Sequence, residues 1–289
     1  MVLKRRRART DFTPAQAQAL ESLVAAPKFE LIPLSNAMDQ AVSLPPGAIV
    51  TVTASPAKGL EATLDLAEAV AAIGHTAIPH LSAHMVRDQA HLDDLLQRMA
   101  YHGFRRAFVV GGDTKSPGAF HDGLALLRAI DEAGRPFDEI GIPAYPQGHP
   151  DISPGRLREV MADKQPFADY MTTQMCFNPE AIVAWIAQMR VDGVTLPVHV
   201  GTPGVAELKK LMTISARIGV ADSARYLKKN RSMVGHLLSP GSFGPDALLE
   251  GLAPSLGEPG VDIEGLHIFT FNQVQATVAW QQRMLAELR

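Results

Sequence analysis

The segment that decides the fold reads AFVV at residues 107–110, GGD at 111–113, FHDGLALLRAIDEA at 120–133 and IGIPAY at 140–145. The first and last of these runs are short and almost continuously apolar, which is typical of strands buried on both faces. The run between them has apolar residues at helical spacing. The order strand, helix, strand predicts a parallel crossover unit, and two glycines and an aspartate directly follow its first strand.

The same order extends over most of the chain. We expect eight strands, at residues 29–33, 48–53, 76–80, 107–110, 140–145, 170–173, 196–200 and 266–270. We expect helices at 59–73, 88–101, 120–133, 155–162, 179–191 and 204–215. Eight such units in about 250 residues match an α/β fold of the (β/α)8 TIM-barrel type, and an open doubly wound sheet is the alternative. The seventh unit is elaborated by a helical segment at 221–229 and a Pro- and Gly-rich surface stretch at 239–260.

The N-terminal residues divide into a tail and a helix. Residues 1–12 contain a basic run that no apolar stretch follows, so we expect a disordered tail and no signal peptide. Thr13, Pro14 and Gln16 predict the start of a helix with a capping box. We therefore expect a single catalytic domain over residues 13–289, with this helix packed against the barrel.

Composition and missing motifs exclude several classes of protein. The chain has 27 basic and 30 acidic residues, and this balance argues against nucleic-acid binding. A single cysteine, Cys176, excludes an internal disulfide framework and a thiolate zinc site. No apolar run approaches the roughly 20 residues of a membrane span, and the sequence lacks HExxH, GxSxG, P-loop and GxGxxG patterns. We expect a cytoplasmic protein without a metal site or membrane contact. Whether the protein forms a homo-oligomer stays open.

Polar residues gather where the predicted strands end, which is where TIM barrels place their active sites. Each has an ordinary structural interpretation, such as a core histidine, a helix cap or loop packing, but their coincidence at one rim favours a site. The residues are Glu30, Thr53, His80, Gly112, Asp113, Tyr145, His149 and Gln174. For Glu30 we favour a proton-donating carboxylic acid over a rim ion pair, because the sequence nominates no partner for a buried carboxylate.

Six of these segments, in order, resemble motifs of the methylenetetrahydrofolate reductase family. FELIPL (29–34) resembles its FEFFPP, PHLS (79–82) its PHLT, and GGD (111–113) its RGD, with Gly111 in place of the arginine. AYPQGHP (144–150) matches its AYPxxHP, ADYMTTQ (168–174) resembles AD[FY]xxTQ, and HIFTFN (267–272) resembles HFYTLN. The resemblance runs over most of the chain.

The resemblance implies a barrel that holds FAD non-covalently and reduces 5,10-methylenetetrahydrofolate to 5-methyltetrahydrofolate. NADH or NADPH would supply the hydride, in one-carbon and methionine metabolism. Carried over to this chain, Glu30 is the general acid, Asp113 lies beside flavin and pterin, and Gln174 binds the pterin. The implied FAD-binding residues are Thr53, His80, Gly112, Asp113, Phe120, Tyr145, His149 and Lys164. Two other functions stay open: oxidation of 5-methyltetrahydrofolate in a demethylation pathway, and non-catalytic folate binding.

Overall fold

The computed structural model describes residues 12–112, 114, 117–207, 211–213 and 242–289. Eight parallel strands form a closed barrel in the order β1-β10-β7-β6-β5-β4-β3-β2. They are β1 (Lys28–Leu31), β2 (Ile49–Val52), β3 (Thr76–Ser82), β4 (Arg106–Val110), β5 (Glu139–Ala144), β6 (Tyr170–Thr173), β7 (Val198–Pro203) and β10 (Ile263–Phe269). Because β1 pairs with both β2 and β10, the sheet has no edge. The predicted TIM barrel is therefore confirmed over the open doubly wound sheet.

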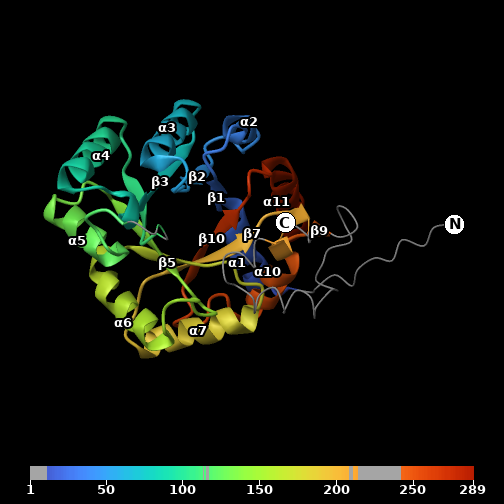
Figure 1. Cartoon of the computed structure of the whole chain (residues 1–289). Helices are drawn as coiled ribbons and strands as arrows, with labels where there is room; N and C mark the ends of the chain where they lie inside the picture. The colour runs from blue at the N-terminus through green and yellow to red at the C-terminus, as the bar shows by residue number, and fades with distance from the viewer. Residues whose placement is uncertain (1–11, 113, 115–116, 208–210, 214–241) are drawn as a thin grey trace.

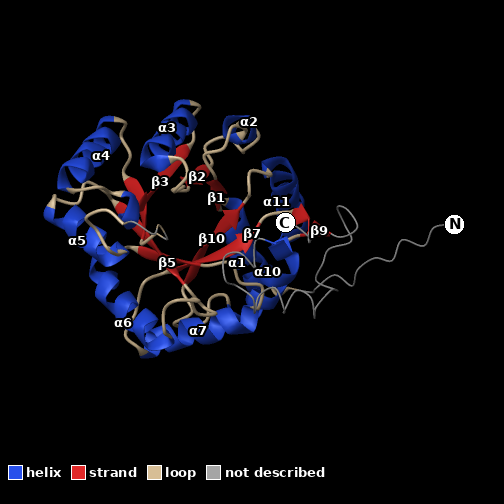
Figure 2. Ribbon diagram, viewed as in Figure 1, coloured by secondary structure: helices blue, strands red, loops and turns tan. Residues whose placement is uncertain are grey.

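Helices surround this barrel, with the strands at the centre (Figures 1 and 2). They are α1 (Pro14–Ala25), α2 (Ala37–Ala41), α3 (Gly59–Ala72), α4 (Gln89–Tyr101), α5 (Gly123–Glu132), α6 (Pro154–Lys164), α7 (Pro179–Val191), α10 (Asp246–Leu252) and α11 (Val274–Leu288). Short 3-10 turns lie at Ala83–Met85, Gln165–Phe167 and Ala253–Ser255. Apolar side chains on the outer face of the strands and the inner faces of the helices form one continuous core.

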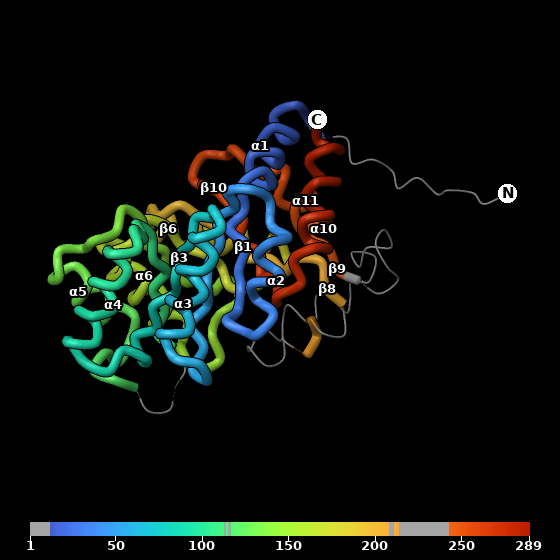
Figure 3. Tube along the Cα trace, turned by 90° about the horizontal axis from the view of Figure 1, so that it is seen from above, coloured from blue at the N-terminus to red at the C-terminus, as the bar shows by residue number. Residues whose placement is uncertain are grey.

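The predicted N-terminal helix is confirmed as α1. The Thr13 side chain accepts a hydrogen bond from the Gln16 backbone, and the Gln16 side chain accepts one from the Thr13 backbone. Figure 3 shows α1 beside α11 at the other end of the chain, and Gln281 donates to the carbonyl oxygen of Val24. The two ends of the described chain therefore close the same side of the barrel. Residues 1–11 of the predicted tail lie outside the described residues.

Two predictions in the seventh unit are wrong. Residues 206–207, assigned to a helix from 204 to 215, form β8 (Ala206–Glu207), which pairs with β9 (Ser242–Phe243). That pairing joins residues far apart in sequence, so local periodicity gave no sign of it. The stretch at 239–260 includes α10, which packs against α7 through buried leucines, so part of it belongs to the helical layer. The helical segment predicted at 221–229 lies outside the described residues.

The start of α5 also differs from the prediction of a helix from residue 120. The helix begins at Gly123 because the Asp122 side chain accepts a hydrogen bond from the Ala125 backbone and caps it. Strand β7 continues to Pro203, three residues beyond its predicted end, because it pairs with β10 along its whole length. Tertiary pairing and capping, which the apolar pattern does not report, set both boundaries.

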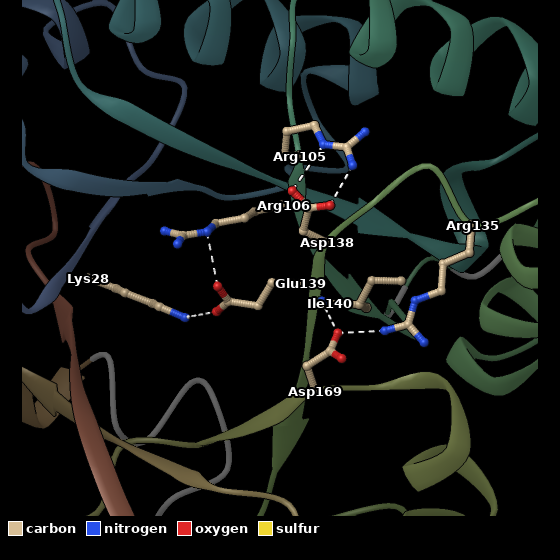
Figure 4. A network of polar contacts seen from close by, with 8 residues as sticks. All are labelled: Lys28, Arg105, Arg106, Arg135, Asp138, Glu139, Ile140 and Asp169. Carbon is tan, nitrogen blue, oxygen red and sulfur yellow. Dashed lines mark hydrogen bonds and ion pairs between the residues drawn. The ribbon is translucent and has the colours of Figure 1, made fainter.

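Ion pairs fill the amino-terminal end of the barrel (Figure 4). Lys28 Nζ lies 2.7 Å from Glu139 Oε1, and Arg106 Nε lies 2.9 Å from Glu139 Oε2. The Lys28 ammonium group also sits 3.3 Å from the centre of the Tyr170 ring. Burial lowers the pKa of Lys28 to about 8, although the bond to Glu139 opposes the shift. Because charged side chains occupy this end, open space for a ligand is expected at the carboxyl ends of the strands.

Candidate active site

A cavity of about 190 Å3 opens at the carboxyl-terminal half of the barrel interior. Residues on alternate strand positions point into it, since side chains along a strand alternate between the two faces. In β1, for example, Phe29 and Leu31 belong to the outer core, whereas Glu30 faces inward. The cavity is lined by Glu30, His80, Phe108, Val110, Pro143, Tyr145, Thr172, Thr173, Gln174, His267 and Phe269.

The carboxyl group of Glu30 has a partner in the structure. Its Oε2 lies 3.1 Å from Nε2 of His267, and the two side chains are 12% and 2% exposed. Sequence reasoning named no partner for Glu30 and missed His267, although His267 begins the motif HIFTFN. The register of the barrel could have found it. Glu30 is level with Phe269 in the pairing of β1 and β10, and His267, two residues before Phe269, lies on the same face of its strand. A buried carboxyl group in contact with one imidazole is suited to holding and releasing a proton.

His80 is buried at the same cavity and has an unpaired ring nitrogen. Its Nε2 has no hydrogen-bond partner among the residues that the structure describes. Burial, and then the charge on His267, lower the pKa of His80 to about 3. The ring is therefore neutral at physiological pH. A neutral imidazole with an unpaired nitrogen is ready to bond a polar edge of a bound molecule.

Tyr145 and Gln174 also lie at this cavity, as the sequence predicted. The Tyr145 ring packs edge-on against His149, with ring centres 5.0 Å apart, and burial raises the pKa of its hydroxyl group. His149 is held in turn, because its Nδ1 accepts a hydrogen bond from the backbone of Asp151. The Gln174 backbone donates to Ala144, and its side-chain oxygen accepts from the Met175 backbone. The structure thus brings Glu30, His80, Tyr145 and Gln174 together.

Other predicted site residues do not line this cavity. Lys164 is buried beside the first turn of α5, where its pKa is lowered by burial despite the nearby Asp122. Gly112 has φ +97°, and a Cβ there would collide with the Ser82 hydroxyl group, so its own neighbours require the glycine. Phe120 packs against the outer core.

Thr53 and Asp113 are two further residues that were predicted to lie at the site. The carbonyl oxygen of Thr53 accepts from the Thr63 hydroxyl group, and its N–H donates to the carbonyl of Leu31, so its backbone supports the barrel. Asp113 lies outside the described residues.

Comparison with known proteins identifies the family. A family model described as "Methylenetetrahydrofolate reductase" matches residues 15–284 of the chain. The chain belongs to the methylenetetrahydrofolate reductase family. The resemblance seen in the six motifs is therefore confirmed, and folate one-carbon reduction is the chemistry of the family.

One curated relative and one solved structure show how this methylenetetrahydrofolate reductase family member compares with individual proteins. "Methylenetetrahydrofolate reductase 2" of Schizosaccharomyces pombe (strain 972 / ATCC 24843) is 30% identical over 128 residues, which cover 38% of this chain and 20% of that protein. The match thus spans about a fifth of the curated relative. A solved structure described as a putative phosphonomutase from Burkholderia cenocepacia J2315 aligns with a TM-score of 0.49 at 11% identity, over 93% of this chain and 98% of that one.

Methylenetetrahydrofolate reductases are generally flavin-dependent, so the cavity can be tested for its fit to FAD. Three residues that line it carry a buried polar atom without a hydrogen-bond partner among the described residues, namely His80 Nε2, Thr172 Oγ1 and His267 Nδ1, and the aromatic rings of Phe108 and Phe269 lie nearby. These groups suit a flat heterocycle that forms hydrogen bonds at its edge, as the ring system of FAD does. By this chemistry the cavity residues fit the ring portion of FAD.

The described residues offer neither a membrane span nor a metal cluster. No helix in the described ranges is long and apolar enough to cross a bilayer. Among the same residues, no three histidine, cysteine, aspartate or glutamate side chains are grouped so that they could hold a metal ion.

Proposed function

We propose that this family member reduces 5,10-methylenetetrahydrofolate to 5-methyltetrahydrofolate, with NADH or NADPH as the hydride source and non-covalent FAD as the carrier. The observation that carries the proposal is the Glu30 carboxyl group, bonded to His267 on the wall of a cavity that Gln174 and His80 also line. A general acid, an amide and a neutral imidazole around one small cavity are the groups that opening and reducing a bridged pterin requires.

In this proposal Glu30 protonates the bridging nitrogen of the substrate that departs. The carbon–nitrogen bond then breaks with its electron pair remaining on that nitrogen, and the methylene carbon becomes an electrophilic iminium carbon that accepts hydride. The side chains of Glu30 and His267 are largely buried, which strengthens the hydrogen bond between acid and substrate. Gln174 would hold the edge of the pterin, and Asp113, in the loop after β4, would lie beside it.

The flavin would be held at the same mouth. His80 and Tyr145 would contact its ring system, and Thr53, Gly112, Asp113, Phe120, His149 and Lys164 are the remaining proposed contacts. When bound, FAD supplies a two-electron acceptor and donor between the nicotinamide and the folate carbon. The protein's own part is to place the folate carbon within reach and to supply the proton.

The experiment separates the two half-reactions. The purified protein, supplied with FAD, is reduced by NADH or NADPH in a stopped-flow spectrometer and then mixed with methylenetetrahydrofolate. Glu30→Gln should retain flavin reduction and lose most folate turnover, since only the folate step needs the acid. Glu264→Gln, an exposed carboxylate on β10, is the matched control and should behave like the wild type.

Two outcomes would correct the proposal in different ways. Equal loss of both half-reactions in Glu30→Gln would show that Glu30 is not the acid. The protein could also be colourless and bind no FAD, yet oxidise NADH or NADPH only when methylenetetrahydrofolate is present. That result would refute the role of FAD and support the folate reaction. Absence of any folate turnover would overturn the proposed function.

A further inference from the structure

Strand β10 and the residues that follow it hold Glu30 and its neighbours on β1 through both side-chain and backbone contacts. His267 contacts the carboxyl group, and the Thr270 hydroxyl group donates to the carbonyl oxygen of Glu30 itself. The Asn272 side chain accepts from the N–H of Ile32 and donates to its carbonyl oxygen, each at 2.9 Å. The carboxyl group and the imidazole therefore belong to one tightly bonded unit of two neighbouring strands.

The surroundings of His267 decide where its ring proton lies. Nδ1 is buried and has no hydrogen-bond partner in the described part of the chain. A proton on Nδ1 would leave a buried N–H unpaired, and it would point the lone pair of Nε2 at the oxygen of Glu30. A proton on Nε2 pairs with that oxygen whether the carboxyl group is ionised or neutral. We therefore assign the tautomer protonated on Nε2.

The other groups around the ring leave Glu30 as its acidic partner. Aromatic rings of Phe108 and Phe269 lie with centres 6.1 and 4.9 Å away, and His80 lies 6.4 Å away. His80 on β3, and His199 on the neighbouring strand β7, have pKa values lowered to about 3 and are neutral.

Lys28, level with His267 in the pairing of β1 and β10, completes the surroundings of the ring. Its charge is already compensated, because it forms the 2.7 Å ion pair with Glu139. Among the described residues, Glu30 is thus the carboxyl group that contacts His267.

We propose that His267 is a positioning residue that directs the proton of Glu30 toward the substrate; the inference rests on the proposed function. The Nε2–H group occupies Oε2, so the acidic proton resides on Oε1. In the transfer, the Oε1–H bond breaks, its electron pair stays on Glu30, and the proton forms an N–H bond at the bridging nitrogen. The imidazole bond to Oε2 exists before and after this step, so it stabilises the carboxylate without rearrangement.

Two substitutions test this role. His267→Phe keeps a ring among Phe108 and Phe269 and removes the donor, whereas His267→Gln keeps an N–H donor of similar reach. With methylenetetrahydrofolate and NADH or NADPH, we expect His267→Phe to lower kcat by about 10- to 100-fold with KM within about twofold. His267→Gln should recover to within about fivefold of the wild type, a rescue that a merely structural role would not give.

The pH profile gives a second readout. The bond from Nε2–H to Oε2 stabilises the carboxylate that proton transfer leaves on Glu30. The alkaline limb of kcat/KM should therefore differ between the wild type and His267→Phe, and His267→Gln should restore the profile of the wild type. His199→Phe removes another interior histidine, which packs on Tyr170, and serves as the control with unchanged limb and kcat.

The results separate this inference from the proposed function. If the wild type and Glu30→Gln behave as proposed but His267→Phe matches the wild type, or His267→Gln fails equally at an unchanged melting temperature, the role of His267 is refuted alone. If the wild type shows no folate turnover, the NMR spectrum of 13C-labelled Glu30 decides. A changed carboxyl chemical shift in His267→Phe supports the pairing, and an unchanged spectrum overturns it.

Discussion

Replacing His199 by phenylalanine should make the protein more resistant to acid. His199 lies in the barrel interior with its ring centre 4.5 Å from that of Tyr170. Burial first, then the charges of Lys28 and His267, lower its pKa from 6.5 to about 3. Between these two pH values the imidazole of His199 is protonated in the unfolded chain and neutral in the folded chain. The stability that a neutral His199 allows is therefore complete above pH 6.5 and is lost as the pH falls from there toward 3.

The magnitude follows from that shift. Each pH unit below 6.5 costs the folded state about 1.4 kcal/mol for this one histidine, so going from pH 7.5 to 5.0 costs about 2 kcal/mol. Phenylalanine has no ring nitrogen to protonate, so the variant avoids this cost. Any packing strain against Gly265, which the His199 ring already crowds, is the same at both pH values and cancels.

Urea unfolding at pH 7.5 and 5.0 measures the effect in wild type and variant. We expect the free energy of unfolding of His199→Phe, relative to the wild type, to rise by about 2 kcal/mol between pH 7.5 and 5.0. The remaining acid sensitivity from His80 is common to both proteins and drops out of the comparison. A difference that is the same at both pH values, within about 0.5 kcal/mol, would refute the reasoning.

Three further predictions concern other parts of the barrel. The free energy of unfolding of the wild type should rise by about 2 kcal/mol between pH 8 and 9.5, because the folded state, in which the pKa of Lys28 is lowered, becomes more favourable once the lysine has lost its proton. Lys28→Met should not show this rise. Parallel pH curves for the two proteins would contradict the reasoning. Asn272→Ala should lower the free energy of unfolding by about 2–4 kcal/mol in urea, because it removes the two hydrogen bonds to Ile32 and places alanine at φ +52°. A loss below about 1 kcal/mol would show that these bonds contribute little to stability. Asp113→Asn should slow the folate half-reaction in stopped flow and leave flavin reduction by the nicotinamide; unchanged folate kinetics would remove Asp113 from the site.

Much of the fold was predictable because its signals are local. The nearly continuous apolar runs identified all eight barrel strands, and Tyr170–Thr173 was predicted to the residue. Thr13 and Gln16 cap α1 as expected, since a capping box depends on residues three positions apart. Where a boundary depended on a distant strand, as in β8 and the end of β7, the prediction was wrong.

The candidate site was predictable in part. Residues that end strands of a closed barrel must meet at one mouth, so placing Glu30, His80, Tyr145 and Gln174 around one cavity followed from the fold class. Lys164 and Phe120 were assigned to the site through the resemblance, and their roles stay predictions. Lys164 is buried beside the first turn of α5, and Phe120 is partly buried against the outer core. Residue type alone does not say whether a side chain faces the mouth or the interior.

The sequence by itself determined the barrel, the capped first helix and the family, because backbone preferences and motifs act over a few neighbouring residues. Only the tertiary structure decided that Glu30 meets His267, 237 positions away, and that Lys28 meets Glu139, 111 positions away. The closure of β1 onto β10 sets Glu30 level with Phe269, and the alternation of side chains then turns His267 into the same interior. Partners of buried charges are selected by strand register, and register is fixed only when the whole barrel closes.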